Sequence, residues 1–554
     1  MNNFDAIVVG SGISGGWAAK ELCEKGLKTL LLERGRQVEH VKDYPTASMA
    51  PWDFQHANQM SKEMQEKQFI QIKGFCNEAN SHFFVNDQEH PYNQVKPFDW
   101  IRGYHVGGRS LMWGRQCYRW SDLDFEANAK EGISIDWPIR YKDIAPWYSY
   151  VEKFVGISGS KEGIPHLPDG EFLPPMEMNC LEQHISTTLK SKGADRQMII
   201  GRVANLTRGW NGRGPCQFRN MCDRGCPFGG YFSSNSATIP VAQNTGNLTL
   251  RPNSVVMEVI YDKEAKKAKG VRIIDAETMK TEEFYAKIIF LNASTLGTTH
   301  ILLNSVSDAF PNGLGNSSGQ IGRNLMDHHY RIGASGTYEG FEDKYTYGRR
   351  ANGIYVPRFQ NLDEKTKRKD YVRGFGFQGG ASRGRAQGEG IGEGFKESVT
   401  EPGQWSMWIG AWGEHLPYED NQVTLNKAKK DKWGLPTLDI SCDFRENEMN
   451  MRKDMQASAE ETLHMAGLKN VLSYNDTKSA PGLCIHEMGT ARMGIDPKTS
   501  VLNKWNQMHE VKNVFITDGA CMTSSANQNP SITYMALTAR AVDFAVRELK
   551  KQNL

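Results

Sequence analysis

The sequence predicts an α/β protein, and three observations in it carry that prediction. An apolar run at 4–9 is followed by the glycine-rich turn Gly10-Ser-Gly12-Ile-Ser-Gly15 and by a helical pattern over 17–24. A second apolar run, "KTLLLERG", ends at Glu33, about twenty residues after the turn. Glycine is abundant, at 54 of 554 residues, which suits the tight turns of an α/β enzyme better than a helical bundle. Strand, glycine turn, helix, strand and acid in this order predict a Rossmann-like domain.

Each residue of this pattern has a physical role. Gly10 makes the turn after the first strand, and Gly12 lets a pyrophosphate approach the N-terminus of the helix. Gly15 allows the helix to pack closely on the strand, and Glu33 is placed to accept hydrogen bonds from the adenosine ribose hydroxyls. We therefore expect a bound dinucleotide, either FAD or NAD. The acid–Arg–Gly ending of "LLLERG" is similar to FAD-binding flavoproteins.

Composition excludes several classes of function. At 554 residues and 62.3 kDa the chain is long enough for two or more domains. Lys and Arg total 66 against 64 for Asp and Glu, without a basic stripe, so we expect neither nucleic acid nor a membrane surface as partner. No apolar run reaches the roughly 18 residues of a transmembrane helix. The first run starts at Phe4, too early for a signal peptide, so we expect no export signal in this chain.

Six later segments, in their order, resemble the glucose–methanol–choline (GMC) oxidoreductase family. They are "YHVGGRSLMWGRQ" (104–116), "IIFLNASTLGTTHILLNS" (288–305), "IGRNLMDHH" (321–329), "CIHEMGTARMG" (484–494), "VFITDGA" (514–520) and "NQNPSITYMALTARAVDFAVREL" (527–549). The resemblance covers nearly the whole chain and implies a GMC-type FAD-binding Rossmann-like domain plus a substrate domain with a mostly antiparallel sheet.

The resemblance also divides the chain into parts. We expect residues 1–330 to form the FAD-binding domain, with a cofactor loop or lid near 45–100 and a cysteine-rich loop at 214–230. Residues 331–460 would form the substrate-binding domain. Residues 461–554 would return to the FAD-binding domain and carry the catalytic residues.

His486 is the expected general base. The segment "HEMGT" is not a zinc-protease motif, because the second histidine of H-E-x-x-H is replaced by Thr490. The resemblance implies instead that His486 removes the hydroxyl proton while a hydride leaves the alcohol carbon for the flavin, a task that suits a neutral imidazole. Asn529 is its expected partner. Pro530 keeps the backbone of Asn529 out of the α region, and in that conformation the Asn529 side chain can hydrogen-bond the substrate oxygen.

The resemblance implies further FAD contacts at turns and strand ends: Gly107, Gly108, Val256, Asp518, Gly519, Asn529 and Pro530. The amides after Pro530 would start a helix that faces the flavin and stabilises its negative charge on reduction. Val256 would contact the adenine through its backbone, although an ordinary buried strand is an equal alternative. Some relatives attach FAD through a histidine at the position of Met112, so we expect non-covalent FAD here.

Three cysteines, Cys216, Cys222 and Cys226, follow a C-x5-C-x3-C spacing that ends in Cys-Pro. A disulfide would leave one of them unpaired, and tetrahedral zinc would need four ligands. Three thiolates ending in Cys-Pro suit an iron–sulfur cluster, most simply a 3Fe-4S cluster. A 4Fe-4S cluster would need a fourth ligand, for which Cys117 is the candidate. Free or oxidised thiols remain the alternative.

This cysteine loop resembles one in GMC-type catalytic subunits of bacterial FAD-dependent sugar dehydrogenases, including glucose and glucoside 3-dehydrogenases. The resemblance implies a dehydrogenase, because an oxidase passes electrons to O2 at the flavin and needs no relay. It also implies a small accessory subunit and a cytochrome or other electron acceptor. The accessory subunit would carry the export signal, so the location would be periplasmic through that partner, or cytoplasmic without it.

On the substrate side, Gln404 and Glu414 are candidate ligands of sugar hydroxyls. Trp405, Trp408 and Trp412 would either stack on sugar rings or belong to the core. The glycine-rich stretch 371–395 would be a mobile lid or a disordered excursion.

The expected reaction is oxidation of a sugar or glycoside ring hydroxyl to a ketone, with C3 of glucosides, giving 3-keto sugars, as the preferred position. The alternatives are an aldose C1 dehydrogenase, a sugar-acid or polyol dehydrogenase, an O2-using oxidase with structural cysteines, and an electron-transfer subunit without alcohol oxidation.

Overall fold

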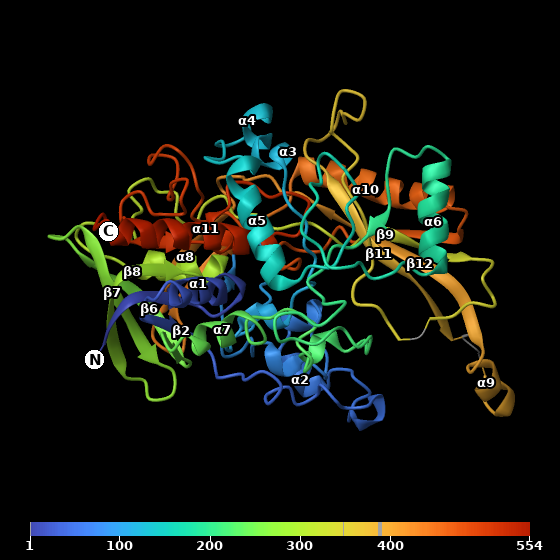
Figure 1. The fold of residues 1–554 in the computed structure, drawn as a ribbon, viewed down its shortest axis with the longest axis horizontal. Coiled ribbons are helices and arrows are strands. Elements are labelled where there is room, and N and C mark those ends of the chain that lie inside the picture. Colours follow the sequence, from blue (N-terminus) through green and yellow to red (C-terminus); the bar gives the residue numbers. More distant parts are fainter. Residues whose placement is uncertain (1, 347, 386–389) are drawn as a thin grey trace.

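The computed structural model describes residues 2–346, 348–385 and 390–554 and places two large sheets next to each other (Figure 1). The first is a seven-stranded sheet in the order β5-β2-β1-β8-β7-β6, with β16 paired to β8. Its strands are β1 (Asn3–Val9), β2 (Thr29–Leu32), β5 (Leu248–Arg251), β6 (Ser254–Asp262), β7 (Lys267–Asp275), β8 (Thr281–Leu291) and β16 (Val514–Ile516). β5, β2, β1, β8 and β16 are parallel, and β7 and β6 extend the sheet antiparallel.

Of the parallel strands, β2, β16 and the second half of β1 are buried on both faces, which is why they are continuous apolar runs in the sequence. Helices α1 (Ile13–Glu24) and α11 (Ser531–Lys550) pack against each other on one side of this sheet (Figure 1). The carboxyl ends of β1, β2, β8 and β16 meet at one edge, and this edge is where a Rossmann-like sheet binds its ligand.

The second sheet is six-stranded and antiparallel, in the order β15-β9-β12-β11-β10-β4. Its strands are β4 (Ile199–Ile200), β9 (Ile332–Tyr338), β10 (Ile354–Val356), β11 (Phe375–Arg385), β12 (Pro402–Gly413) and β15 (Lys469–Asn475). Helix α10 (Glu446–Met465) packs on one face of it. The predicted fold class is confirmed. The division into 1–330, 331–460 and 461–554 stays a prediction, and β4 and β15 join this sheet from outside 331–460.

The remaining elements surround these sheets. They are β3 (Asn93–Gln94), β13 (Gln422–Lys430) and β14 (Pro436–Ser441), which form a small third sheet, and helices α2 (Lys62–Lys67), α3 (Asp122–Phe125), α4 (Ala127–Glu131), α5 (Tyr141–Val155), α6 (Cys180–Ser191), α7 (Thr238–Asn244), α8 (Thr295–Asn304) and α9 (Glu393–Ser398). Within the described ranges, every helix is too short or too polar to cross a membrane.

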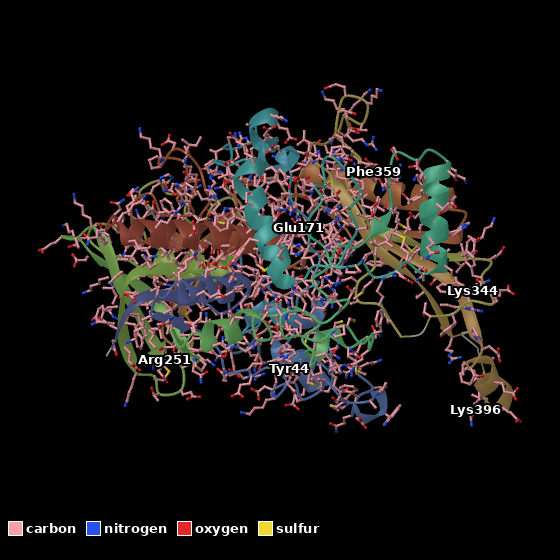
Figure 2. All side chains as sticks on the ribbon, in the orientation of Figure 1. Tyr44, Glu171, Arg251, Lys344, Phe359 and Lys396 are labelled. Carbon is pink, nitrogen blue, oxygen red and sulfur yellow. The ribbon has the colours of Figure 1, made fainter. Side chains whose placement is uncertain are left out.

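The glycine-rich stretch 371–395 is partly regular structure. Its first half contains β11, and α9 lies at the tip of an arm that projects from the body, where Lys396 is marked in Figure 2. Residues 386–389, on which part of the lid prediction falls, lie outside the described residues.

Candidate active site

A cavity of about 300 Å³ lies between the carboxyl edge of the first sheet and one face of the second sheet, a size typical of ligand sites. Most of the residues predicted to bind cofactor or substrate line it: Gly10, Gly12, Glu33, Gly108, Val256, His486, Asp518, Gly519 and Asn529. Gly15, Gly107 and Pro530 lie outside the lining. Phe75, Phe84 and Trp100 bring the 45–100 segment into the cavity wall.

The glycine turn has the geometry that a pyrophosphate needs. A Cβ added to Gly12 would meet nothing within 4 Å, so the space beside this backbone is open. A Cβ on Gly15 would lie 1.7 Å from the carbonyl oxygen of Gly10, so Gly15 packs the helix onto the strand and does not face the ligand. Within the described residues no side chain caps the start of α1, and its N-terminus adjoins the cavity. The turn therefore fits a dinucleotide phosphate.

Glu33 is buried at the end of β2 and is held in place by three donors. The N–H and hydroxyl of Ser11 donate to Oε2 at 3.1 and 2.5 Å, and the N–H of Gly35 donates to Oε1 at 3.0 Å. Burial raises the pKa of Glu33, and these donors oppose the rise. The carboxyl group is thus fixed at the position predicted for the ribose contact.

We expect Glu33→Ala to weaken FAD binding by about ten- to a hundredfold, because a hydrogen bond to a charged group contributes about 1.5–3 kcal/mol. Glu33→Gln keeps one acceptor oxygen and should lose less affinity for FAD than Glu33→Ala. Titration of the apoprotein with FAD, followed by flavin fluorescence, measures both. Equal affinities for the wild type and Glu33→Ala would show that Glu33 only supports the turn.

Asp518 and Gly519 lie on the other side of the cavity, after β16. The hydroxyl of Thr298 donates to Asp518 Oδ2 at 2.5 Å, and burial raises the pKa of Asp518 to about 6. A Cβ on Gly519 would lie 2.3 Å from the carbonyl oxygen of Glu487, so this position requires glycine. The strand end and the loop that carries His486 are in direct contact here.

His486 and Asn529, the predicted catalytic pair, lie together at the cavity wall. Asn529 Nδ2 lies 3.5 Å from His486 Nε2. Gln378, on β11, donates from Nε2 to Asn529 Oδ1 at 2.7 Å and also lines the cavity. Because Oδ1 of Asn529 accepts from Gln378, the NH2 end of the Asn529 side chain is the end that faces His486.

His328 fixes the tautomer of His486. Nε2 of His328 contacts the carbonyl oxygen of Ala526, so this nitrogen carries the proton and Nδ1 of His328 is an acceptor. His328 Nδ1 lies 2.8 Å from His486 Nδ1, which must therefore donate. The lone pair of His486 is left on Nε2, the atom that faces Asn529 and the cavity. His328 was not predicted, although the quoted segment "MDHH" contains it.

The pKa of His486 is shifted in the direction that a general base needs. Burial lowers it well below the usual value, and His328 and Arg109 lower it further. Arg109 is held by Glu487 in an ion pair with N–O distances of 2.7 and 3.0 Å. The imidazole of His486 is therefore uncharged at pH 7, and it stays uncharged at about pH 6.5, where an ordinary histidine would be half protonated.

The loop that presents His486 is held by one buried carboxylate. Asp327 accepts hydrogen bonds from the N–H groups of Gly482, Cys484 and His486 at 2.8, 3.1 and 2.9 Å. Ile485, between the last two donors, has a φ of 67°, which is unusual for a β-branched residue. Such strain persists where the surroundings impose it, here through Asp327.

We expect His328→Phe to lower kcat by about tenfold and to leave FAD binding unchanged, because His486 loses the partner that selects its tautomer. Since His328 also lowers the pKa of His486, the acid limb of the kcat/KM profile should move to higher pH. His328→Asn, which keeps an acceptor, should recover part of kcat. An unchanged pH profile in both variants would contradict this role.

The two predicted substrate ligands do not line the cavity. Gln404 is exposed on β12, eight residues from the cavity-lining Trp412 and so about 27 Å along the strand. Glu414 is buried and paired with Arg358 at 3.0 Å, and burial raises its pKa to about 8. These two predictions are therefore corrected. Trp405 is buried in the core behind the sheet.

The three loop cysteines line one small hollow. The rest of it is lined by Asn205, Gln217, Arg219, Asn220, Met221, Phe228, Tyr231 and Arg349. Gly225 has a φ of +82°, and a Cβ there would lie 2.5 Å from the ring of Tyr44, so the loop requires glycine between Cys222 and Cys226. Cys117 does not line the hollow. Cys117 lies in the core instead. It therefore cannot be the fourth ligand that a 4Fe-4S cluster in the hollow would need.

Residues that line the main cavity contact a residue that lines the cysteine hollow. Arg115 lines the main cavity, and its guanidinium lies 4.5 Å from the ring centroid of Tyr231, which lines the hollow. The hydroxyl of Tyr231 donates to the carbonyl oxygen of Trp113 at 3.1 Å, and Trp113 also lines the main cavity.

Among the described residues, the group of three potential metal ligands that meet within 4.8 Å is His328, Cys484 and His486, not the three loop cysteines. A single zinc ion at about 2.3 Å from each sulfur would hold the sulfurs about 4 Å apart. The loop therefore does not form a single-ion site. At His328 and His486, the lone pair of His328 Nδ1 that an ion would need already accepts the hydrogen bond from His486 Nδ1.

Two family models match the chain. One, described as GMC oxidoreductase and covering the N-terminal part of that family, matches residues 4–330, and one for its C-terminal part matches residues 417–538. Two solved structures share the fold. They are pyridoxine 4-oxidase from Mesorbium loti (13% identity, TM-score 0.60, 98% of this chain and 99% of that chain) and a single-residue mutant of formate oxidase from Aspergillus oryzae RIB40 (14%, 0.61, 99% and 99%).

Three curated proteins are similar over nearly their whole length. They are 2-methyl-1,2-propanediol dehydrogenase of Mycolicibacterium austroafricanum (29% identity, 98% of this chain, 95% of that protein), the fructose dehydrogenase large subunit of Gluconobacter japonicus (25%, 99% and 98%) and the gluconate 2-dehydrogenase flavoprotein of Pantoea cypripedii (25%, 100% and 95%).

Proposed function

The chain belongs to the GMC oxidoreductase family, which binds FAD, and from that premise we propose that it is a dehydrogenase of sugar or glycoside hydroxyls. The observation that carries the proposal is the convergence of His486 Nε2 and the Asn529 amide, 3.5 Å apart, in the cavity that the dinucleotide turn also lines. A hydroxyl oxygen placed between them would donate its proton to His486 and accept a hydrogen bond from Asn529.

The residues of this chain prepare the proton transfer. His328 keeps the proton of His486 on Nδ1, and Gln378 keeps the amide of Asn529 turned toward the substrate position. After the transfer, the positive charge on His486 would be shared with the His328 ring. FAD, which Gly12, Glu33 and Asp518 would hold without a covalent bond, supplies the acceptor for the hydride that leaves the alcohol carbon.

We further propose that Cys216, Cys222 and Cys226 hold an iron–sulfur cluster, most simply 3Fe-4S. All three line one hollow, and their sulfur atoms do not all lie within 4.8 Å of one another, as the thiolates of a single ion would. Three thiolates from one loop are the ligands that a 3Fe-4S cluster takes. The contacts of Arg115 and Trp113, which line the main cavity, with Tyr231, which lines the hollow, support electron transfer out of the site. Such a relay supports a dehydrogenase over an oxidase.

We propose a sugar or glycoside as substrate, with C3 of glucosides as the preferred position. Trp412 stacks on Tyr330 in the cavity wall at 5.9 Å, an arrangement that suits a pyranose ring. Relatives named for fructose and gluconate support the sugar class. The relative named for 2-methyl-1,2-propanediol favours a polyol as the second candidate, and oxidation at the anomeric carbon of an aldose is a third.

Activity with an artificial dye tests this proposal. The purified protein should reduce the dye under argon with methyl β-glucoside, and NMR of the product should show a ketone at C3. In air, peroxide should form much more slowly than the dye is reduced. Peroxide formation at the rate of dye reduction would establish an oxidase, and activity with diols alone would establish the second candidate.

A small accessory subunit and a cytochrome or other acceptor are the proposed partners, with a periplasmic location reached through the accessory subunit. The names "large subunit" and "flavoprotein" of two relatives support such an assembly. Co-expression with the neighbouring genes, followed by fractionation of periplasm and cytoplasm, tests both points. Recovery of the active flavoprotein alone from the cytoplasm would contradict them.

A further inference from the structure

The face of the six-stranded sheet that borders the cavity continues beyond it. On β12, Trp405, Met407, Ile409 and Ala411 point into the core against α10, so Trp408, Gly410 and Trp412 point the other way. Trp412 lines the cavity, and Trp408 is its next neighbour outward, with ring centroids 6.5 Å apart at 85°. Trp408 is 44% exposed, so this tryptophan faces solvent on one side and adjoins the cavity-lining Trp412 on another.

The ring of Trp408 is fixed although it is exposed. Its Nε1 donates to the hydroxyl of Tyr474 on β15 at 2.7 Å. A Cβ on Gly410 would lie 2.8 Å from Cζ2 of Trp408, and a Cβ on Gly333 would lie 2.8 Å from the Tyr474 hydroxyl. The two rings therefore lie over glycines, and any side chain at these two positions would push them off the sheet. We call Trp408, Tyr474, Gly410 and Gly333 the aromatic platform.

The surroundings of the aromatic platform are mixed. Leu472 on β15, which is 72% exposed, pairs with Ser335 beside it, and the carboxylate of Glu182, held by Arg350, lies 3.4 Å from where a Cβ of Gly380 would be. Trp408 pairs across the sheet with Gly380 on β11 and Ser335 on β9. Along β11, the residues on this face are Gln378, Gly380 and Ser382, and Gln378 reaches Asn529 in the cavity. A fixed indole among hydroxyl and amide groups suits a neutral ring with apolar C–H faces and hydroxyl edges, which describes a pyranose better than a charged ligand.

We propose that the aromatic platform is a second substrate subsite, which binds the ring attached to the sugar that is oxidised. This inference rests on the proposed function and specifies its substrate class: glycosides with two rings would bind more tightly than single sugars. Trp412 and Tyr330 would contact the ring inside the cavity, and Trp408 would stack on the second ring outside it.

Two ligands and matched variants test the subsite. Calorimetric titration of the FAD-loaded enzyme with methyl β-glucoside (one ring) and cellobiose (two rings) gives Kd, and anaerobic dye reduction gives kcat and KM. For Trp408→Ala, Kd for cellobiose should rise about five- to tenfold while Kd for methyl β-glucoside changes less than about twofold. Gly410→Ala should act in the same direction by displacing the ring, and Trp408→Phe should retain part of the affinity.

Trp52→Ala is the control, because Trp52 is also an exposed tryptophan, at 85%, and does not line the cavity. It should leave both Kd values unchanged. Equal affinities of wild type and Trp408→Ala for cellobiose, equal losses for both sugars, or absence of binding of both sugars by the wild type would overturn the subsite. Binding with the expected ratio but without turnover would support the subsite and overturn the proposed sugar oxidation instead.

Discussion

Replacement of His486 by alanine is expected to lower kcat by about 10²–10⁴-fold, with little change in FAD content, because general-base catalysis contributes about this much. The structure places the unprotonated Nε2 of His486 next to Asn529, and Nδ1 is occupied by His328. Sugar-driven dye reduction under argon measures the loss. In the wild type, kcat/KM should stay flat from about pH 8 down through about 6.5, because the lowered pKa keeps this base neutral there.

His464→Ala is the matched control, since His464 is an exposed histidine on α10 away from the cavity. It should leave kcat unchanged. If His486→Ala reduced the dye with sugar as fast as the wild type, His486 would not be the general base. A wild-type protein that reduces no dye with any sugar or polyol would instead be an electron-transfer subunit without alcohol oxidation of its own.

Replacement of Cys222 by serine is expected to remove or destabilise the proposed cluster and to stop electron transfer to a protein acceptor. Reduction of the flavin by sugar should continue, because His486, Asn529 and the dinucleotide turn lie in the other cavity. Reduction of added cytochrome c, stopped-flow absorbance of the flavin and iron content separate these effects. The variant should show fast flavin reduction, low iron and nearly no cytochrome reduction.

Cys180→Ser is the control, because Cys180 is a partly exposed free cysteine that does not line the hollow. It should retain iron and cytochrome reduction. Full cytochrome reduction by Cys222→Ser would mean that electrons leave by another route. The loop would then be structural, and the oxidase alternative would gain support.

The parts of the site that the sequence predicted are those set by local backbone geometry. The turn from Gly10 to Gly15 must follow a strand and precede a helix, and Glu33 ends the next strand, so their positions follow from chain order. His486 and Asn529 were predicted from motifs in the resemblance. The antiparallel second sheet was likewise predicted from the family and not from residue patterns.

The parts that were missed depend on contacts between distant segments. His328 and Gln378 act on His486 and Asn529 across separations of 158 and 151 residues, which no local pattern reports. Glu414 was expected at a substrate because it follows the tryptophan-rich strand. The strand ends at Gly413, however, and Glu414 pairs with a buried arginine instead. Burial and pairing of this kind are decided by tertiary packing.

We propose above all that electrons leave the active site through a cluster on the cysteine loop. EPR spectroscopy of the purified protein, with iron and acid-labile sulfide determined on the same sample, tests it most directly. We expect iron and sulfide in cluster ratio and a signal in the oxidised protein that disappears when sugar is added under argon. Protein from iron-replete cells, handled without air, that contains no iron would contradict the claim and leave Cys216, Cys222 and Cys226 as structural thiols.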